Sequence, residues 1–177
     1  MTVHTSTPDK MKNKSLVYSL TMVGLLFLAS CSPAQPKKIG PNITADTLAE
    51  AFDKIDSFGL SGIADYHNLH RADLEWVSGT LTLQWKSFRR YVAKYYSVSG
   101  TDCDDQVRGF CFLAQQLDPG VAIGEFWYKR AQGDGHSVCS VLSSVGGVDT
   151  VLFYEPQLDR FVTLTPDEIK SSHFRRQ

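Results

Sequence analysis

Residues 101–120 have the sequence TDCDDQVRGFCFLAQQLDPG, and residues 121–138 continue with VAIGEFWYKRAQGDGHSV. In the first of these stretches, apolar side chains recur at helical spacing, and Asp102 has the short acidic side chain that suits a helix N-cap. The apolar face holds Cys103, Val107, Phe110, Cys111, Ala114 and Leu117. Because the Pro-Gly pair at the end of the stretch stops the pattern, it predicts a helix with Cys103 in its first turn.

After Gly120 the hydrophobic period changes from 3.6 toward 2, which indicates strands. Residues 121–130 are rich in β-branched and aromatic side chains, and the loop 131–135 has the length of a hairpin connection. Three further strands are expected, at 136–143, 150–154 and 160–164. Thr165 is followed by proline at the next position and by Glu168, so a short C-terminal helix is predicted there.

The chain before residue 101 predicts helices: capping-box spacing at Thr47 favours a helix over 47–58, and apolar spacing favours helices over 63–77 and 83–96. Helices followed by a strand meander indicate an α+β domain. We expect N-terminal helices and a Cys-bearing central helix packed on an antiparallel sheet of about four strands. One core between the sheet and that helix is expected to hold Val107, Phe110, Val138, Leu152, Phe153, Phe161 and Val162.

The first thirty residues have the features of a secretory signal. Two lysines precede the uncharged run 16–29, which is shorter than the roughly 20 apolar residues that a membrane-spanning helix needs. Met11 is the better start of such a signal. The segment Leu-Ala-Ser-Cys ending at Cys31 resembles the lipobox of bacterial lipoproteins, which implies cleavage before Cys31 and attachment of fatty acyl chains such as palmitate. The alternative is an ordinary signal peptide with an incidental cysteine.

The expected organisation is a signal peptide at 1–30, a lipidated Cys31 with a tether at 31–41, and one domain at 42–177. By the same resemblance, Ser32 implies sorting to the outer membrane, facing the periplasm of a bacterial cell envelope. The chain has 18 Lys+Arg, 19 Asp+Glu and a formal net charge of −1. This balance argues against a nucleic-acid partner, because neutralising phosphates needs a surplus of basic side chains. The expected membrane contact is through the lipid anchor.

Three cysteines remain in the domain if Cys31 is acylated. An odd number in a compartment where disulfides persist leaves at least one thiol free or bonded to another molecule. Either Cys103 or Cys111 can bridge to Cys139. The second bridge is favoured, because Cys111 is deep in the apolar stripe and Cys139 has the strand parity opposite to His136.

A nucleophilic thiol needs a lowered pKa, a general base within hydrogen-bond reach and a group that orients the base. Cys103 has electrostatic help at a helix N-terminus, because the unpaired N–H groups and the macrodipole favour a thiolate, although the neighbouring aspartates oppose it. His136 opens the strand after the hairpin loop, and Glu155 ends the next strand. We expect them as base and orienting acid, with Asp149 as the alternative acid.

Three segments together resemble the transglutaminase-like cysteine peptidases of bacteria and phages. Residues 101–105, Thr-Asp-Cys-Asp-Asp, resemble their Cys-Asp/Glu-Asp helix start, and residues 135–138, Gly-His-Ser-Val, resemble their Gly-His-x-Val strand. Residues 155–157, Glu-Pro-Gln, resemble an acidic-Pro-Gln segment that some members carry. The resemblance covers residues 88–164 and departs at 106–107, where Gln-Val replaces an aromatic-Ala pair.

The resemblance implies a papain-like or transglutaminase-like fold with Cys103 as nucleophile, His136 as base and Glu155 as orienting group. The implied reaction acts on an amide bond of a protein or peptide substrate, with hydrolysis favoured over crosslinking, and needs no cofactor or metal.

His67 and His70 can share a helix face as zinc ligands do, but no third ligand has a suitable spacing.

The alternative is a catalytically inactive binding or envelope-interaction lipoprotein that keeps the same fold. In that case Cys103 is a small core residue, His136 caps a strand, and Glu155 is an ordinary acid before a turn. The two alternatives differ in one chemical property, which is whether the Cys103 thiol reacts as a thiolate at neutral pH.

Overall fold

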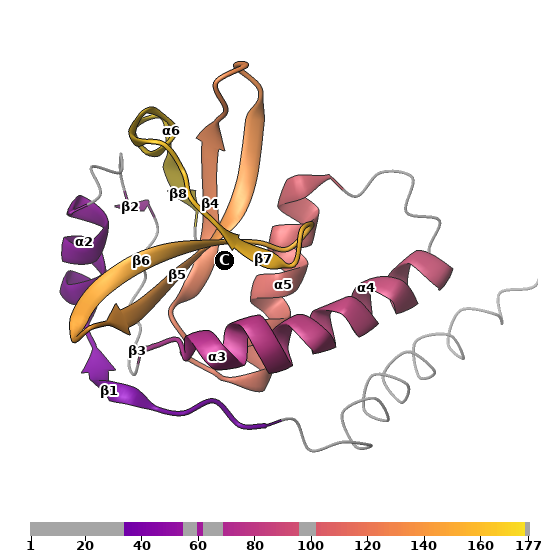
Figure 1. Cartoon of the computed structure of the whole chain (residues 1–177), viewed down its shortest axis with the longest axis horizontal. Helices are drawn as coiled ribbons and strands as arrows, with labels where there is room; N and C mark the ends of the chain where they lie inside the picture. The colour runs from indigo at the N-terminus through magenta and orange to yellow at the C-terminus, as the bar shows by residue number, and fades with distance from the viewer. Residues whose placement is uncertain (1–33, 55–59, 62–68, 96–101, 176–177) are drawn as a thin grey trace, which may run out of the picture. The chain divides into compact units, whose positions relative to one another are not determined.

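The structure is a computed structural model that describes residues 34–54, 60–61, 69–95 and 102–175 (Figure 1). The chain divides into two compact units, Met1–Ala34 and Gln35–Gln177, and the helices and strands that the structure describes belong to the second. The predicted signal peptide, Cys31 and His67 lie outside the described residues. Among the helices within the described ranges, none is long and apolar enough to cross a membrane.

A four-stranded antiparallel meander forms the centre of the domain, as predicted. Its strands are β4 (Ile123–Lys129), β5 (Gly135–Val145), β6 (Val148–Glu155) and β7 (Arg160–Val162). Two short strands extend the sheet beyond β4: β8 (His173–Arg175), antiparallel to β4, and β2 (Leu60–Ser61), parallel to β8. The order is β2-β8-β4-β5-β6-β7, so the α+β class is confirmed, with two more strands than expected.

The turn between β5 and β6 fixes the register of the sheet. Gly146 and Gly147 both have positive φ, of 60° and 83°, as a two-residue type I′ hairpin requires. The register that follows places Cys139 opposite Tyr154. The preceding hairpin places His136 opposite Tyr128.

Helix α5 (Cys103–Leu117) has the predicted start and length. The side chain of Asp102 caps it by accepting a hydrogen bond from the backbone N–H of Asp105. The buried face of α5 packs on the sheet, where the ring of Phe110 stacks on Tyr154 at a centroid distance of 4.8 Å. Cys103 is therefore in the first helical turn, as the sequence predicts.

The sheet has a separate core on each face, so the prediction of one core is wrong. Val138 and Phe153 point to the face covered by α2 (Ala45–Asp53), where Phe52 stacks against Phe126. Val107, Phe110, Cys139 and Tyr154 belong to the other core, with Phe161 packed against it. Spacing in the sequence shows which residues share one face of a strand, but it does not show which helix covers that face.

The segment before α5 differs from the predicted helix over 63–77. Within its described part, β3 (Leu69–Arg71) pairs antiparallel with β1 (Ile39–Ile43). The helical path begins after Asp73, whose carboxylate accepts hydrogen bonds from the N–H groups of the next turn. It runs through α3 (Leu74–Trp76), a π-helical turn η1 (Val77–Leu81) and α4 (Thr82–Tyr95), and α4 confirms the helix predicted over 83–96.

Capping residues explain the ends of the two short helices. α2 is capped by Thr44, whose side chain accepts from the N–H of Thr47, so the helix starts earlier than predicted. α6 (Pro166–Lys170) has the predicted capping box between Thr165 and Glu168. β1 begins at Ile39, inside the segment predicted as a tether, so the end of that segment belongs to the domain.

Candidate functional site

His136 and Glu155 form a buried, hydrogen-bonded pair where β5 and β6 separate. Their exposed fractions are 6% and 4%. Nε2 of His136 lies 2.5 Å from Oε2 of Glu155, and Oε1 of Glu155 accepts a hydrogen bond from the backbone N–H of Gln157 at 3.2 Å. Both carboxylate oxygens therefore have donors, and the structure brings these two predicted site residues together.

Helix α4 holds the end of β6 in place. The carbonyl oxygen of Pro156 accepts from Nε1 of Trp85 at 2.9 Å and from Nη1 of Arg89 at 2.8 Å. Nη2 of Arg89 also donates to Asp159 at 3.0 Å. The position of Glu155 thus depends on contacts between α4 and the residue that follows it.

Arg130 forms a hydrogen bond with the other nitrogen of the His136 ring. Nη2 of Arg130 is 2.8 Å from Nδ1 of His136. A guanidinium only donates hydrogen bonds, so Nδ1 must accept, and the ring proton is on Nε2, facing Glu155. The contacts therefore select a neutral imidazole whose basic nitrogen is Nδ1, the atom that a general base would use.

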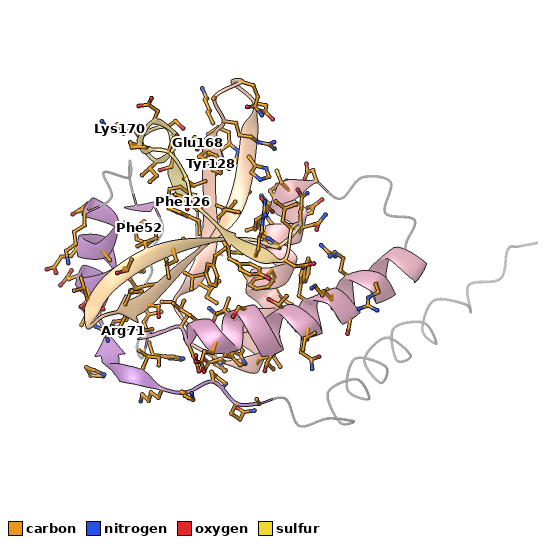
Figure 2. The ribbon with its side chains drawn as sticks, viewed as in Figure 1. Phe52, Arg71, Phe126, Tyr128, Glu168 and Lys170 are labelled. Atoms are coloured by element: carbon orange, nitrogen blue, oxygen red, sulfur yellow. The ribbon has the colours of Figure 1, made fainter. Side chains whose placement is uncertain are left out.

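Tyr128 lies beside the His136 ring, with its own ring edge-on at a centroid distance of 5.7 Å. Burial, followed by the charges of Glu168 and Glu155, raises the pKa of Tyr128 to about 12, so its hydroxyl stays protonated at neutral pH. Figure 2 shows Tyr128 and Glu168 at the same end of the domain.

Cys103 is partly exposed at the start of α5, and its thiol is free. Among the described contacts, its sulfur makes no hydrogen bond to His136 or to another residue. Strand alternation gives the reason: Cys139 packs toward α5, so His136, three residues earlier on β5, points to the opposite face of the sheet. The structure therefore brings His136 and Glu155 together, and a Cys103 contact with Nδ1 requires a rearrangement.

Acidic groups surround the start of α5. The carboxylates of Asp102, Asp104 and Asp105 lie within 4.8 Å of one another, and the hydrogen bond between the first two raises the pKa of Asp104 and lowers that of Asp102. Arg108 offsets part of this charge, at 2.8 Å from Asp104 and 3.5 Å from the buried Glu125. Exposed acidic groups of this kind oppose a thiolate and are common without a bound ion.

The alternative acid, Asp149, has a different partner. It lies at the other end of β6, where both of its oxygens accept from Arg71, at 2.5 and 2.9 Å. His70, considered as a metal ligand, is instead bound to Asp118 through Nε2 at 2.9 Å. Neither residue contributes to the pair formed by His136 and Glu155.

Cys111 and Cys139, the favoured disulfide partners, face each other as free thiols with their sulfurs 3.8 Å apart. Both are buried between α5 and β5. Burial and the contact with Cys111 raise the pKa of Cys139 well above its ordinary value. A disulfide between these two residues leaves Cys103 as the free thiol of the domain.

Sequence reasoning missed Arg130 and Tyr128. The register of the first hairpin contains a signal for Tyr128, because a short loop after residue 130 brings the ends of the two strands opposite each other. The Arg130 contact depends on a side-chain conformation, for which the sequence has no periodic signal.

No known protein family, curated protein or solved structure matches this chain.

Proposed function

We propose that the protein is a lipoprotein, anchored through Cys31 to the bacterial outer membrane, with a transglutaminase-like domain that attacks an amide bond through Cys103. The observation that carries the proposal is the buried hydrogen bond between His136 and Glu155, which holds Nδ1 in its basic form. A histidine oriented by a carboxylate, together with a cysteine at a helix start, is the set of groups that thiol catalysis uses.

In the proposed reaction, Nδ1 of His136 takes the thiol proton of Cys103, and the thiolate attacks the carbonyl carbon of the substrate. The negative charge of Glu155 stabilises the imidazolium that forms. Backbone N–H groups in the first turn of α5 stabilise the oxyanion of the tetrahedral intermediate. The imidazolium then protonates the leaving amine, which leaves a thioester on Cys103.

The thioester has two fates. Attack by water gives peptide or amide hydrolysis and regenerates the thiol, whereas attack by a second amine gives a crosslink. Hydrolysis is the favoured outcome, because water is present at far higher concentration than any amine. The expected substrate is a protein or peptide, reached from the membrane surface.

Two observations favour the second candidate, a non-catalytic binding module. Arg130 occupies Nδ1, and strand alternation points His136 away from the face on which α5 packs. In this alternative the hydrogen bond between His136 and Glu155 only stabilises the fold at the point where β5 and β6 separate. The two functions make opposite predictions about the reactivity of Cys103.

The test is the rate of alkylation of Cys103 by iodoacetamide as a function of pH, read by mass spectrometry of the Cys103 peptide. If His136 is the base, wild-type Cys103 reacts well below the pH at which a free cysteine, with a pKa of about 8.5, becomes a thiolate. His136→Gln removes this reactivity, and Glu155→Gln reduces it. His70→Gln is the matched control, because it alters a histidine–carboxylate pair elsewhere and leaves the profile unchanged.

The binding module is supported instead if the alkylation profile of Cys103 follows that of a free thiol and does not respond to His136→Gln. Cys111 and Cys139 serve as internal references in every sample, because both are buried and react slowly while the domain is folded. A rise in their labelling identifies any variant that has unfolded.

A further inference from the structure

We propose that Arg130 determines substrate specificity by binding a carboxylate of the substrate, and that this binding releases Nδ1 of His136. The inference rests on the proposed function, because it names the substrate class of the same site. It starts from one contact, the hydrogen bond of 2.8 Å from Nη2 of Arg130 to Nδ1.

That contact is incompatible with proton transfer. Nδ1 of a neutral imidazole has one lone pair, and Arg130 uses it as an acceptor. The thiol proton of Cys103 therefore competes with the guanidinium for Nδ1, and the thiolate forms only in molecules in which Arg130 has withdrawn. An imidazolium would also carry a second N–H toward the guanidinium, where two donors and two positive charges repel each other. Withdrawal of Arg130 is therefore a required step of the proposed mechanism.

The guanidinium has an unsatisfied donor that points to the kind of group it binds. Nε of Arg130 is shielded from solvent and has no hydrogen-bond partner among the described residues. Asp134 forms an ion pair with Nε at 3.6 Å, which is beyond hydrogen-bond length, so it offsets the charge of Arg130 without accepting this N–H. A buried donor without an acceptor destabilises the arrangement, so a ligand that supplies an acceptor is favoured.

A carboxylate fits the Nε and Nη2 edge of the Arg130 guanidinium better than a neutral carbonyl group. Nε and Nη2 form a planar fork that donates two parallel hydrogen bonds, and a carboxylate offers two oxygens at the matching separation. Binding it satisfies Nε and replaces the imidazole as the acceptor of Nη2. Arg130 is 36% exposed and borders the exposed loop 131–135, so a ligand can approach it from solvent.

The proposal thus describes a peptide substrate with a carboxylate close to the scissile amide. The carboxylate binds the guanidinium of Arg130, which frees Nδ1 of His136. The thiol proton of Cys103 then moves to Nδ1. Arg130 stays protonated throughout, and the step needs no oxidant or other co-reactant. Without a carboxylate, Arg130 withdraws in only a fraction of the molecules, so neutral substrates react through the same groups at a lower rate.

Two alkylating agents of nearly equal size test this directly. Iodoacetate has a carboxylate where iodoacetamide has a neutral amide. The rate of alkylation of Cys103 by iodoacetate divided by its rate with iodoacetamide therefore reports carboxylate binding next to the thiol. The ratio for free glutathione in the same buffer gives the intrinsic reactivity. We expect the ratio at Cys103 to exceed that of glutathione by about tenfold, the effect of one charge-assisted bidentate contact.

Arg130→Gln is expected to return the ratio to the glutathione value, while the iodoacetamide rate stays the same or rises because Nδ1 is freed. Lys129→Gln is the matched control: it removes the same charge from the adjacent residue and keeps the wild-type ratio. Arg130→Lys keeps the positive charge but loses the two parallel N–H donors of the guanidinium, so it is expected to lower the ratio by about threefold. This variant decides the result if Arg130→Gln does not fold.

An unchanged ratio in Arg130→Gln or, if that variant does not fold, in Arg130→Lys overturns the proposal. Failure of the proposed function gives a different result, in which the iodoacetamide rate at Cys103 does not respond to His136→Gln. The iodoacetate ratio then still reports whether Arg130 binds a carboxylate, because it compares two reagents at the same thiol.

Discussion

His136 has both ring nitrogens bound, and the chemistry of each bond is different. Glu155 accepts from Nε2, which orients the ring and can stabilise a positive charge on it. Arg130 donates to Nδ1, which fixes the tautomer and blocks the atom that a base would use. The same residue is therefore oriented for proton transfer and prevented from it, and the exchange of one hydrogen-bond partner decides between the two states.

Arg71 and Asp149 form an ion pair whose effect on stability depends on pH. The hydrogen bond from Arg71 lowers the pKa of Asp149, and the side chains are only 14% and 20% exposed. A carboxyl group with a lowered pKa in the folded state stabilises the fold above its unfolded pKa of about 3.9, and this contribution is lost as the pH falls through the folded value. We expect Arg71→Gln to cost about 1–2 kcal/mol near neutral pH.

Urea unfolding at several pH values measures this difference. The loss caused by Arg71→Gln should shrink in acid, as the pH falls from about 3.9 through the lowered folded pKa of Asp149, because Asp149 then becomes protonated in the folded wild type. Asp149→Asn and the double variant complete a mutant cycle, which separates the pair from the other hydrogen bond of Arg71, to the carbonyl of Pro41. A loss that does not vary with pH would show that the Pro41 contact, and not the ion pair, is responsible.

Phe110 connects α5 to the sheet, so its removal tests the packing of the helix that bears Cys103. Its ring is fully buried, stacks on Tyr154 at 4.8 Å and meets Trp85 edge-on at 5.9 Å. Phe110→Ala should lower the free energy of unfolding by about 3–5 kcal/mol, because it leaves a cavity beside the rings of Tyr154 and Trp85. The measurement is the midpoint and slope of denaturant unfolding.

Phe112 provides the matched control on the same helix. Its side chain is 60% exposed, so Phe112→Ala should change the free energy of unfolding by less than about 0.5 kcal/mol. Similar losses for the two variants would mean that the buried face of α5 is assigned to the wrong side.

The sequence predicts elements better than their arrangement. α5 and the strands of the meander follow from period and capping, because each signal is local to the element that it describes. β3 was missed because Leu69–Arg71 is too short to show a period of 2, and its stability comes from pairing with the distant β1. The contact of His136 with Glu155 was predictable from strand order, whereas the Arg130 contact and the separate cores depend on how elements pack.

In the whole protein, we expect the N-terminus to hold the domain at a membrane. We predict that mature protein begins at Cys31 and fractionates with membranes, because the signal ends in the lipobox-like segment at residues 28–31. Cys31→Ala should release the protein or leave it unprocessed. Cell fractionation with a high-salt wash measures this, and a variant that still fractionates with membranes after the wash argues against a lipid anchor.

The central claim is that the Cys103 thiol gives its proton to His136. The most direct measurement is the ultraviolet absorbance of the thiolate as a function of pH, taken as the difference between wild type and Cys103→Ser. The account predicts thiolate absorbance in the wild type at pH values well below about 8.5, where a free cysteine is protonated, and its loss in His136→Gln. Absorbance that appears only near or above that pH, and equally in both proteins, would contradict it.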